Sequence, residues 1–380
     1  MASDHAAPGR RPLELEDVIR PPVRDAVPPL PVGLIGAGWI ARECHLPAYR
    51  QAGVNVVGIA SRRRQHAEEL VRERGCRAVG SWQELVASPE VAILDIAYPP
   101  DRQPEVILEA CRHGDHIRGI LAQKPLAPDL ATATAVARAA ESAGIALAVN
   151  QNMRYDRSIR SLRALLDDGR FGRLLFAQIN MHAPVAWMEY AREYERKGML
   201  IMSIHHLDCF RYLFGEPERI LASVAGPAPA PDGGPDESAA YILEYADGLR
   251  AIGIDDCHSW ADIGISWRVE GTAGIAKGTI GWPDHPWGSP STLDFVAADA
   301  PARWFSPRWP ERWFPDAFAQ TMGALLRHVA DGAPLDIAAQ DNLATMALLE
   351  AAYRSAAEHR AVSPNELSAP PGAAAQPEDR

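Results

Sequence analysis

The chain has 380 residues, of which 47% are hydrophobic, so it is long enough for two domains with substantial cores. Its net charge of -11 argues against binding to nucleic acid or to an anionic membrane surface, and no apolar run is long enough to cross a bilayer. The 5 cysteines are scattered and form no CxxC pair, which is typical of reduced thiols in a cytoplasmic protein rather than of a disulfide scaffold or a zinc site.

Both ends of the chain have the composition of extensions. Residues 1–30 are rich in proline, arginine and acidic residues, and we expect an extension that is partly disordered and otherwise lies against the protein body or a neighbouring subunit. Residues 366–380 predict a disordered tail. The pair Arg10-Arg11 resembles a twin-arginine export signal, but acidic residues follow it in place of an apolar segment, which again favours a cytoplasmic protein.

The first predicted strand, residues 32–35, is an apolar run that stops at a glycine and leads directly into a helical pattern. Gly36 can adopt the positive φ of a tight turn, and Gly38 leaves room for a pyrophosphate near the backbone. Ala41 occupies the third glycine position of a dinucleotide-binding turn and still permits close helix–strand packing. An ordinary strand–turn–helix is the alternative. The residues expected to contact a dinucleotide here are Gly36, Gly38, Trp39 and Ile40.

Strands and helices then alternate for more than a hundred residues. Four further strands are predicted at 54–60, 91–97, 116–121 and 145–149, with helical patterns between them. This pattern predicts an α/β Rossmann domain over residues 31–152, with a doubly wound parallel sheet. Ligands of such sheets bind at the carboxyl ends of the strands. The residues at those ends are Gly36, Ser61, Tyr98, Lys124 and Asn150.

The second half changes character, because several segments alternate partly with a period of two. These segments lie at 174–182, 239–245, 248–254 and 263–269. Helical patterns at about 157–166 and 203–213 flank them. We therefore expect residues 153–365 to form an α+β domain with a mostly antiparallel sheet, one face covered and one open.

Lys124 lies just after a predicted strand and directly before a proline that biases it towards an extended conformation. An ammonium group at this edge of the sheet can bind a substrate hydroxyl or the nicotinamide ribose, and it can exchange protons if burial lowers its pKa. The alternative is an exposed lysine in a turn.

A second cluster is the sequence His205-His206-Leu207-Asp208. Positions three apart share a helix face, so Asp208 is expected beside His205, where a carboxylate would orient an imidazole for proton transfer. A buried structural histidine is the alternative. A metal site is disfavoured, because adjacent histidines point to different sides of a helix.

The residues after the second strand bear on the choice of nicotinamide nucleotide. An acidic residue there would bind the ribose 2′-hydroxyl, but this chain has Ser61, Arg62, Arg63 and Arg64. A hydroxyl and several guanidinium groups suit a 2′-phosphate, so NADP is the expected preference over NAD. The alternative is that the arginines begin a solvated helix.

Substrate contacts are expected from the open face of the second domain and from the start of that domain. Aromatic rings with polar groups at their edges are typical of carbohydrate recognition, and Trp187 and Trp282 lie in predicted loops, although packing or a subunit interface explains them equally well. The candidate substrate-binding residues are Arg154, Tyr155, Asn180, His182, His205, Asp208 and His258.

Over about residues 31–362 the chain resembles the glucose–fructose oxidoreductase / inositol dehydrogenase / MocA (Gfo/Idh/MocA) family of NAD(P)-dependent oxidoreductases. The motifs that carry the resemblance are Gly36-Ala37-Gly38-Trp39-Ile40-Ala41, Gln123-Lys124-Pro125, His205-His206-Leu207-Asp208, Glu270-Gly271-Thr272-Ala273-Gly274 and Asp341-Asn342-Leu343. The resemblance implies that Lys124 and His205 are the catalytic residues and that the protein is a homodimer or homotetramer.

Three positions depart from the family pattern. Gln123 replaces a glutamate, Ile201 stands where many relatives carry an aspartate that works with the histidine, and Ser203 replaces a glycine.

The predicted activity is hydride transfer between nicotinamide and a secondary alcohol or ketone of a sugar, cyclitol or sugar-derived acid. In oxidation His205 would take the hydroxyl proton while Lys124 polarises the oxygen. A lyase or isomerase that recycles tightly bound nucleotide and a non-catalytic nucleotide-binding protein are the alternatives.

Overall fold

The computed structural model describes residues 14–21, 26–72, 76–184, 188–192, 194–226, 236–281 and 289–368. Its first sheet has six parallel strands in the order β3-β2-β1-β4-β5-β6. The strands are β1 (Val32–Ile35), β2 (Val56–Ala60), β3 (Arg77–Val79), β4 (Ile93–Ile96), β5 (Gly119–Ala122) and β6 (Ala146–Val149). Because β1 pairs with both β2 and β4, the strand order reverses at β1. The predicted doubly wound parallel sheet is confirmed.

Helices cover both faces of this sheet, which explains why its strands read as continuous apolar runs. Every residue of β1, β4 and β5 is buried. The helices between the strands are α2 (Leu46–Ala52), α3 (Arg64–Val71), α4 (Trp82–Val86), α5 (Gln103–His113) and α6 (Leu130–Ser142), with a π-helical turn, η1 (Ala41–His45), before α2.

The second sheet has seven strands in the order β13-β12-β11-β7-β10-β9-β8, and of these neighbours only β7 and β10 run parallel. The strands are β7 (Leu174–His182), β8 (Arg219–Ala225), β9 (Ser238–Glu244), β10 (Arg250–Asp256), β11 (Gly264–Gly271), β12 (Gly274–Ile280) and β13 (Thr292–Ala297). The predicted mostly antiparallel sheet is therefore confirmed.

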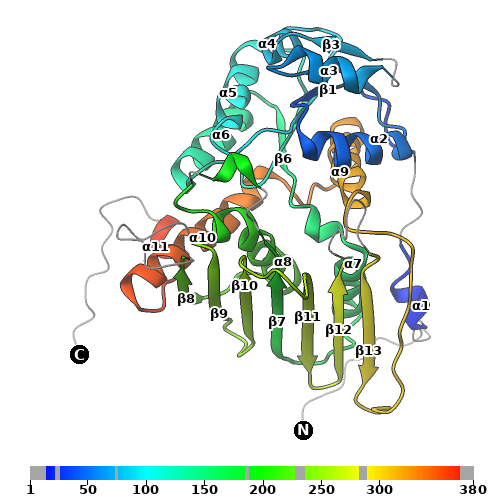
Figure 1. The fold of residues 1–380 in the computed structure, drawn as a ribbon. Helices are drawn as coiled ribbons and strands as arrows, with labels where there is room; N and C mark the ends of the chain where they lie inside the picture. The colour runs from blue at the N-terminus through cyan, green and yellow to red at the C-terminus, as the bar shows by residue number, and fades with distance from the viewer. Residues whose placement is uncertain are drawn as a thin grey trace.

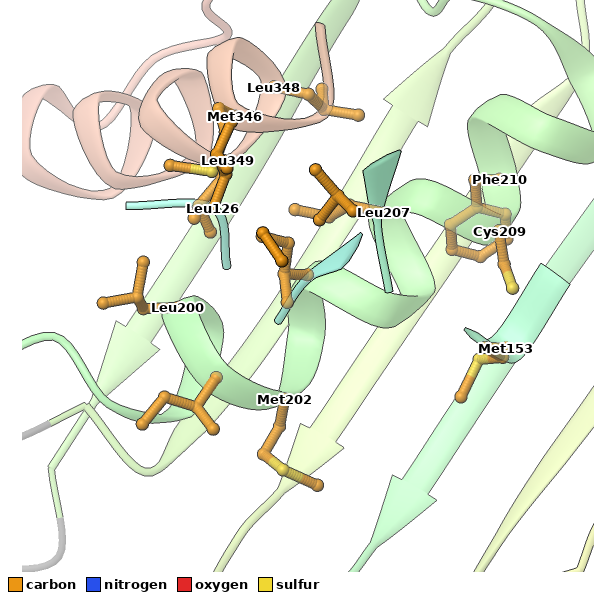
Figure 2. Packing of buried hydrophobic residues seen from close by; sticks show 14 of the residues in the cluster. Leu126, Met153, Leu200, Met202, Leu207, Cys209, Phe210, Met346, Leu348 and Leu349 are labelled. Atoms are coloured by element: carbon orange, nitrogen blue, oxygen red, sulfur yellow. The ribbon is translucent and has the colours of Figure 1, made fainter. Parts of the chain in front are cut away.

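One face of the second sheet is covered by three helices, as Figure 1 shows: α7 (Arg157–Asp167), α8 (Ile204–Phe214) and α10 (Ala339–Glu358). Short helical turns lead into the first two, namely η2 (Asn152–Tyr155) and η4 (Gly198–Ser203), and η3 (Glu189–Ala191) precedes η4. In Figure 2 Leu207 of α8, Leu126 after β5 and Met346 of α10 lie in one buried cluster. The core is thus continuous between the two sheets, and it fixes the position of η4 and α8 relative to the end of β5.

Helix α9 (Asp316–Asp331) lies within residues 153–365, the range predicted for the second domain. This helix packs on α2, β5 and β6 of the first sheet. Its buried residues Phe318, Met322 and Leu325 share a cluster with Val32 and Leu121. The apolar spacing of α9 correctly indicates a helix, but it carries no information about which of two apolar sheets that helix covers.

Parts of both extensions are ordered. Helix α1 (Leu15–Val18) packs on α7, and Arg157 Nη2 donates a hydrogen bond to the Ile19 carbonyl at 2.7 Å, so this part of the extension lies against the second domain. The predicted disordered tail begins inside a short helix, α11 (Asn365–Ser368), where Glu366 forms an ion pair with Arg360. Residues 369–380 lie outside the described part of the chain. Within the described ranges, every helix is too short or too polar to cross a membrane.

Candidate active site

The turn after β1 has the geometry of a phosphate cradle. Gly36 has a φ of +113°, and a Cβ added to it would meet the Ala97 carbonyl oxygen at 2.6 Å, so only glycine fits. A Cβ added to Gly38 would meet nothing within 4 Å, so the backbone is open to a ligand there. Ala41 is completely buried among the residues of β1 and β2, which brings the helix close to the strands. These features fit the pyrophosphate of a dinucleotide.

The groups expected at the adenosine ribose lie beside this turn, at the end of β2. Ser61 is buried and its Oγ accepts a hydrogen bond from the Arg63 amide at 3.3 Å. Arg62 and Arg63 are exposed, whereas Arg64 forms an ion pair with Glu68 at 2.9 Å. Burial raises the pKa of Tyr98, and the positive charge of Arg62 opposes that rise. The two side chains therefore lie close enough for their charges to interact.

Lys124 follows β5 and reaches across to the second domain. Its Nζ donates a hydrogen bond to the backbone carbonyl of Ile201, in the π-helical turn η4. Burial lowers the pKa of Lys124 to about 7, because a low-dielectric environment disfavours the ammonium form. The residue at the aspartate position therefore contacts the lysine through its main-chain oxygen, and its side chain supplies no carboxylate to the histidine.

His205, the second residue of α8, is only 4% exposed and lies beside Lys124. Its ring packs edge-on against Trp313, with 5.3 Å between ring centroids. Burial, and next the charges of Lys124 and His206, lower the pKa of His205 well below its usual value. Its Nδ1 is buried and has no hydrogen-bond partner among the described residues. The structure thus brings Lys124 and His205 together at the carboxyl end of the first sheet.

The predicted pairing of His205 with Asp208 is wrong. Asp208 accepts hydrogen bonds from Arg154 Nε and Nη2 at 2.6 and 2.7 Å, and from Thr345 Oγ1 at 2.8 Å. Arg154, which is 5% exposed, also forms an ion pair with Asp341 at 2.7 Å. A buried guanidinium group needs carboxylate partners. Arg154 therefore binds the carboxylate of Asp208, which the sequence spacing had placed beside the imidazole of His205.

Tyr155, another predicted substrate contact, is also engaged within the protein. Its hydroxyl donates a hydrogen bond to Asp336, and the guanidinium of Arg160 stacks 4.0 Å from the centre of its ring. The polar groups of Arg154, Tyr155 and Asp208 therefore contribute to the junction between η2, α8 and α10, and their contact with a substrate stays a prediction.

The remaining predicted substrate residues that the structure describes belong to the second domain. Asn180 and His182 alternate along β7 with buried residues that pack under α8, so they lie on the opposite, open face of the sheet, where His182 is 3.5 Å from Asp256. His258 lies 3.3 Å from Glu237, which also pairs with Lys197 just before η4. Trp187 and Trp282 are outside the described residues.

Sequence reasoning missed two residues of this site, Trp313 and Gln151. Trp313 is 1% exposed, and its Nε1 donates to Asn152 Oδ1 at 3.0 Å, which orients the ring against His205. The side-chain amides of Asn150 and Gln151 are buried, and no described residue bonds to them. Buried amides without protein partners are free to bond to a water molecule or to a polar ligand. The aromatic density of residues 304–314 was the available signal for Trp313.

Gln123, beside Lys124, belongs to a buried polar network. Its side-chain amide lies 2.7 Å from His45 Nε2, while His45 Nδ1 lies 2.6 Å from Asp95. Tyr49 donates to the same Asp95 oxygen at 2.7 Å. The network connects η1, α2, β4 and the end of β5, and it holds the residue that precedes the lysine.

The comparisons with known proteins agree with this arrangement. Residues 30–151 match the oxidoreductase family, NAD-binding Rossmann fold, and residues 159–277 match the GFO/IDH/MocA C-terminal domain. An inositol 2-dehydrogenase of Rhizobium meliloti strain 1021 is 27% identical over 342 residues, which are 87% of this chain and 98% of that protein. A D-apiose dehydrogenase of Paraburkholderia graminis is 26% identical over 353 residues, 88% of this chain and 90% of the relative.

A solved structure shares the fold. An oxidoreductase from Agrobacterium radiobacter, crystallised with NAD+, L-tartaric acid and magnesium, superimposes with a TM-score of 0.77 at 22% identity, over 89% of this chain and 99% of that one. Both domains match one family in the same order, each over its own sheet, and the relatives are dehydrogenases. The chain therefore belongs to the Gfo/Idh/MocA family of NAD-binding oxidoreductases.

Proposed function

We propose that this oxidoreductase transfers hydride between a nicotinamide nucleotide and a secondary alcohol or ketone of a sugar, a cyclitol or a sugar-derived acid. The observation that carries the proposal is the meeting of Lys124 and His205 at the carboxyl end of the first sheet, the same edge that carries the Gly36 turn. The relatives named inositol 2-dehydrogenase and D-apiose dehydrogenase support the substrate class.

Backbone groups and side chains together would hold the nucleotide. The open backbone at Gly36 and Gly38 suits the pyrophosphate, and the orphaned amides of Asn150 and Gln151 suit the polar groups at the nicotinamide end. When bound, the nicotinamide supplies or accepts the hydride. Lys124 and His205 then bind the substrate oxygen and exchange its proton, while the ring of Trp313 closes one side of the imidazole to water.

The decisive experiment is a turnover assay of the purified protein with NAD and NADP and a panel of myo-inositol, D-apiose, D-glucose and L-tartrate. We expect the absorbance of reduced nicotinamide to grow with one class of these compounds. Conversion of a sugar without net change in nicotinamide absorbance would instead support the lyase or isomerase alternative. Binding of nucleotide with no conversion of any kind would support the non-catalytic alternative.

The arginines after β2 predict a preference for NADP. Replacing Arg62 and Arg63 with alanine should weaken NADP binding about tenfold or more while leaving NAD binding nearly unchanged, since guanidinium groups pair with a phosphate but add little at a hydroxyl. Calorimetric titration of both nucleotides measures the change. Arg64→Ala is the control, because Arg64 already pairs with Glu68. Tighter binding of NAD than of NADP by the natural protein would contradict the preference.

The open face of the second sheet supports a homodimer or homotetramer. Leu221, Ile242 and Ile252 lie side by side across β8, β9 and β10, and Leu221 and Ile242 are 44% and 37% exposed. Ile242→Lys is expected to reduce the mass measured by light scattering, because a desolvated ammonium opposes burial of this row. Gln83→Lys on α4 adds the same charge away from the sheet and should leave the mass unchanged. An unaltered mass for Ile242→Lys would exclude this face as the interface.

A further inference from the structure

We propose that Lys124, and not His205, accepts the hydroxyl proton of the substrate, and that His205 acts as a neutral hydrogen-bond donor to the same oxygen. The inference rests on the proposed hydride transfer, and it reverses the roles predicted from the sequence. It follows from what the structure places around each of the two side chains.

The Lys124 amine has no carboxylate partner among the described residues. Its hydrogen-bond acceptor is the uncharged Ile201 carbonyl, and Gln123 presents an amide where the family pattern has an acid. The titratable group that faces it from the second domain is His205. A neutral amine can donate one N–H to the carbonyl and keep its lone pair for a proton, and burial favours this neutral form by lowering the pKa to about 7.

The network behind Gln123 also carries no charge to the lysine. Because His45 Nδ1 lies 2.6 Å from the Asp95 carboxylate, the proton of this imidazole belongs on Nδ1, and Nε2 accepts from the Gln123 amide at 2.7 Å. Asp95 Oδ2 therefore accepts from both His45 and Tyr49, while Oδ1 has no partner among the described residues, and the group of this network next to Lys124 is the uncharged amide of Gln123.

His205 is poorly placed to become an imidazolium. An imidazolium has two N–H donors, and its Nδ1–H would be buried without an acceptor. The neighbouring His206 does not bond to it: His206 Nδ1 lies 2.6 Å from Asp255, and His206 Nε2 has no hydrogen-bond partner among the described residues. A proton on Lys124 would add a like charge next to the ring. The imidazole thus remains neutral, with Nε2 as the ring nitrogen left for a ligand.

In the oxidative direction the O–H bond of the substrate breaks. Its proton goes to the lone pair of Lys124 Nζ, and the electrons of the broken bond form the C=O bond. The C–H bond breaks with both electrons passing to an oxidised nicotinamide nucleotide, the co-reactant. The resulting ammonium keeps its hydrogen bond to the Ile201 carbonyl, and His205 keeps its hydrogen bond to the carbonyl oxygen. In reduction the ammonium returns the proton.

The sequence provides a direct readout that needs neither substrate nor nucleotide, because lysine occurs only at positions 124, 197 and 277. In protein labelled with ¹³C-lysine, Lys124→Met identifies the Cε resonance of Lys124, and the exposed Lys277→Met serves as the matched control. We expect this resonance to titrate with a midpoint of about 7. In Gln123→Glu the midpoint should rise by about one pH unit or more, since a carboxylate favours the ammonium. A midpoint above about 9 in the natural protein overturns the inference.

Kinetics provide the second test, with the compound that the panel identifies. The kcat/KM for oxidation should rise with pH through about 7 and then level off, because the base must be unprotonated. Lys124→Met should lower kcat/KM by about 10²–10⁴-fold, and kcat/KM of this variant should no longer rise with pH. His205→Asn should lower kcat/KM about tenfold, and kcat/KM of this variant should still rise with pH through about 7. A rise that survives in Lys124→Met but disappears in His205→Asn would overturn the inference, whereas no turnover at all alongside a Lys124 midpoint of about 7 would refute the proposed function alone.

Discussion

A Gly36→Ala variant is expected to lose both nucleotide binding and a large part of its folding stability. At a φ of +113° an L-residue is strained by about 1–3 kcal/mol. The new Cβ would in addition lie 2.6 Å from the Ala97 carbonyl oxygen, so β1 and β4 must separate at their ends. Chemical denaturation without ligand measures the stability, and nucleotide titration measures the binding.

Gly38→Ala is the matched control two residues away. Nothing lies within 4 Å of its added Cβ, so the unliganded protein should keep its stability within about 0.5 kcal/mol. The methyl group would occupy the space through which a pyrophosphate approaches the backbone, so the rise in melting temperature with nucleotide should disappear. If nucleotide raised the melting temperature of Gly38→Ala as much as that of the natural protein, the placement of the pyrophosphate at this turn would be contradicted.

An Arg154→Met variant should lower the free energy of unfolding by about 3–5 kcal/mol, because it leaves the buried carboxylate of Asp208 without its cation. The same carboxylate would keep only Thr345 as a donor among the contacts described above. Asp341 is less affected, since its side chain is 42% exposed and also pairs with Arg211. Urea denaturation of the two proteins gives the difference.

Two comparisons separate this structural role from the substrate-binding role expected from sequence. Arg64→Met breaks a surface ion pair whose side chains are 68% and 48% exposed, and it should cost less than about 1 kcal/mol. If Arg154 bound substrate instead, Arg154→Met would raise KM strongly and leave the denaturation midpoint unchanged. That outcome would overturn the assignment of Arg154 and Asp208 to the junction between η2, α8 and α10.

Local sequence was sufficient where the chemistry is local. The apolar runs that end at Gly36, Ser61 and Asn150 predicted a doubly wound sheet, since buried parallel strands must be apolar on both faces. The positive φ at Gly36 follows from a turn between adjacent elements. The helix that carries His205 was predicted from its own apolar spacing.

Contacts between distant segments could not be read in this way. The partners of Asp208 come from positions 154 and 345, and α9 covers the first sheet although more than 160 residues separate it from the last strand there. Helical spacing states which side chains share a face, but the tertiary structure decides what that face meets.

By itself, the sequence determined the family, the two sheets and the placement of Lys124 at a strand end, because each depends on patterns within a few dozen neighbouring residues. Only the tertiary structure decided the environment of the two catalytic candidates. In the folded chain Lys124 donates to a main-chain oxygen, and His205 Nδ1 has no partner among the described residues. The charge state of a buried amine or imidazole depends on desolvation and on partners from every side, and those exist only once the chain is folded.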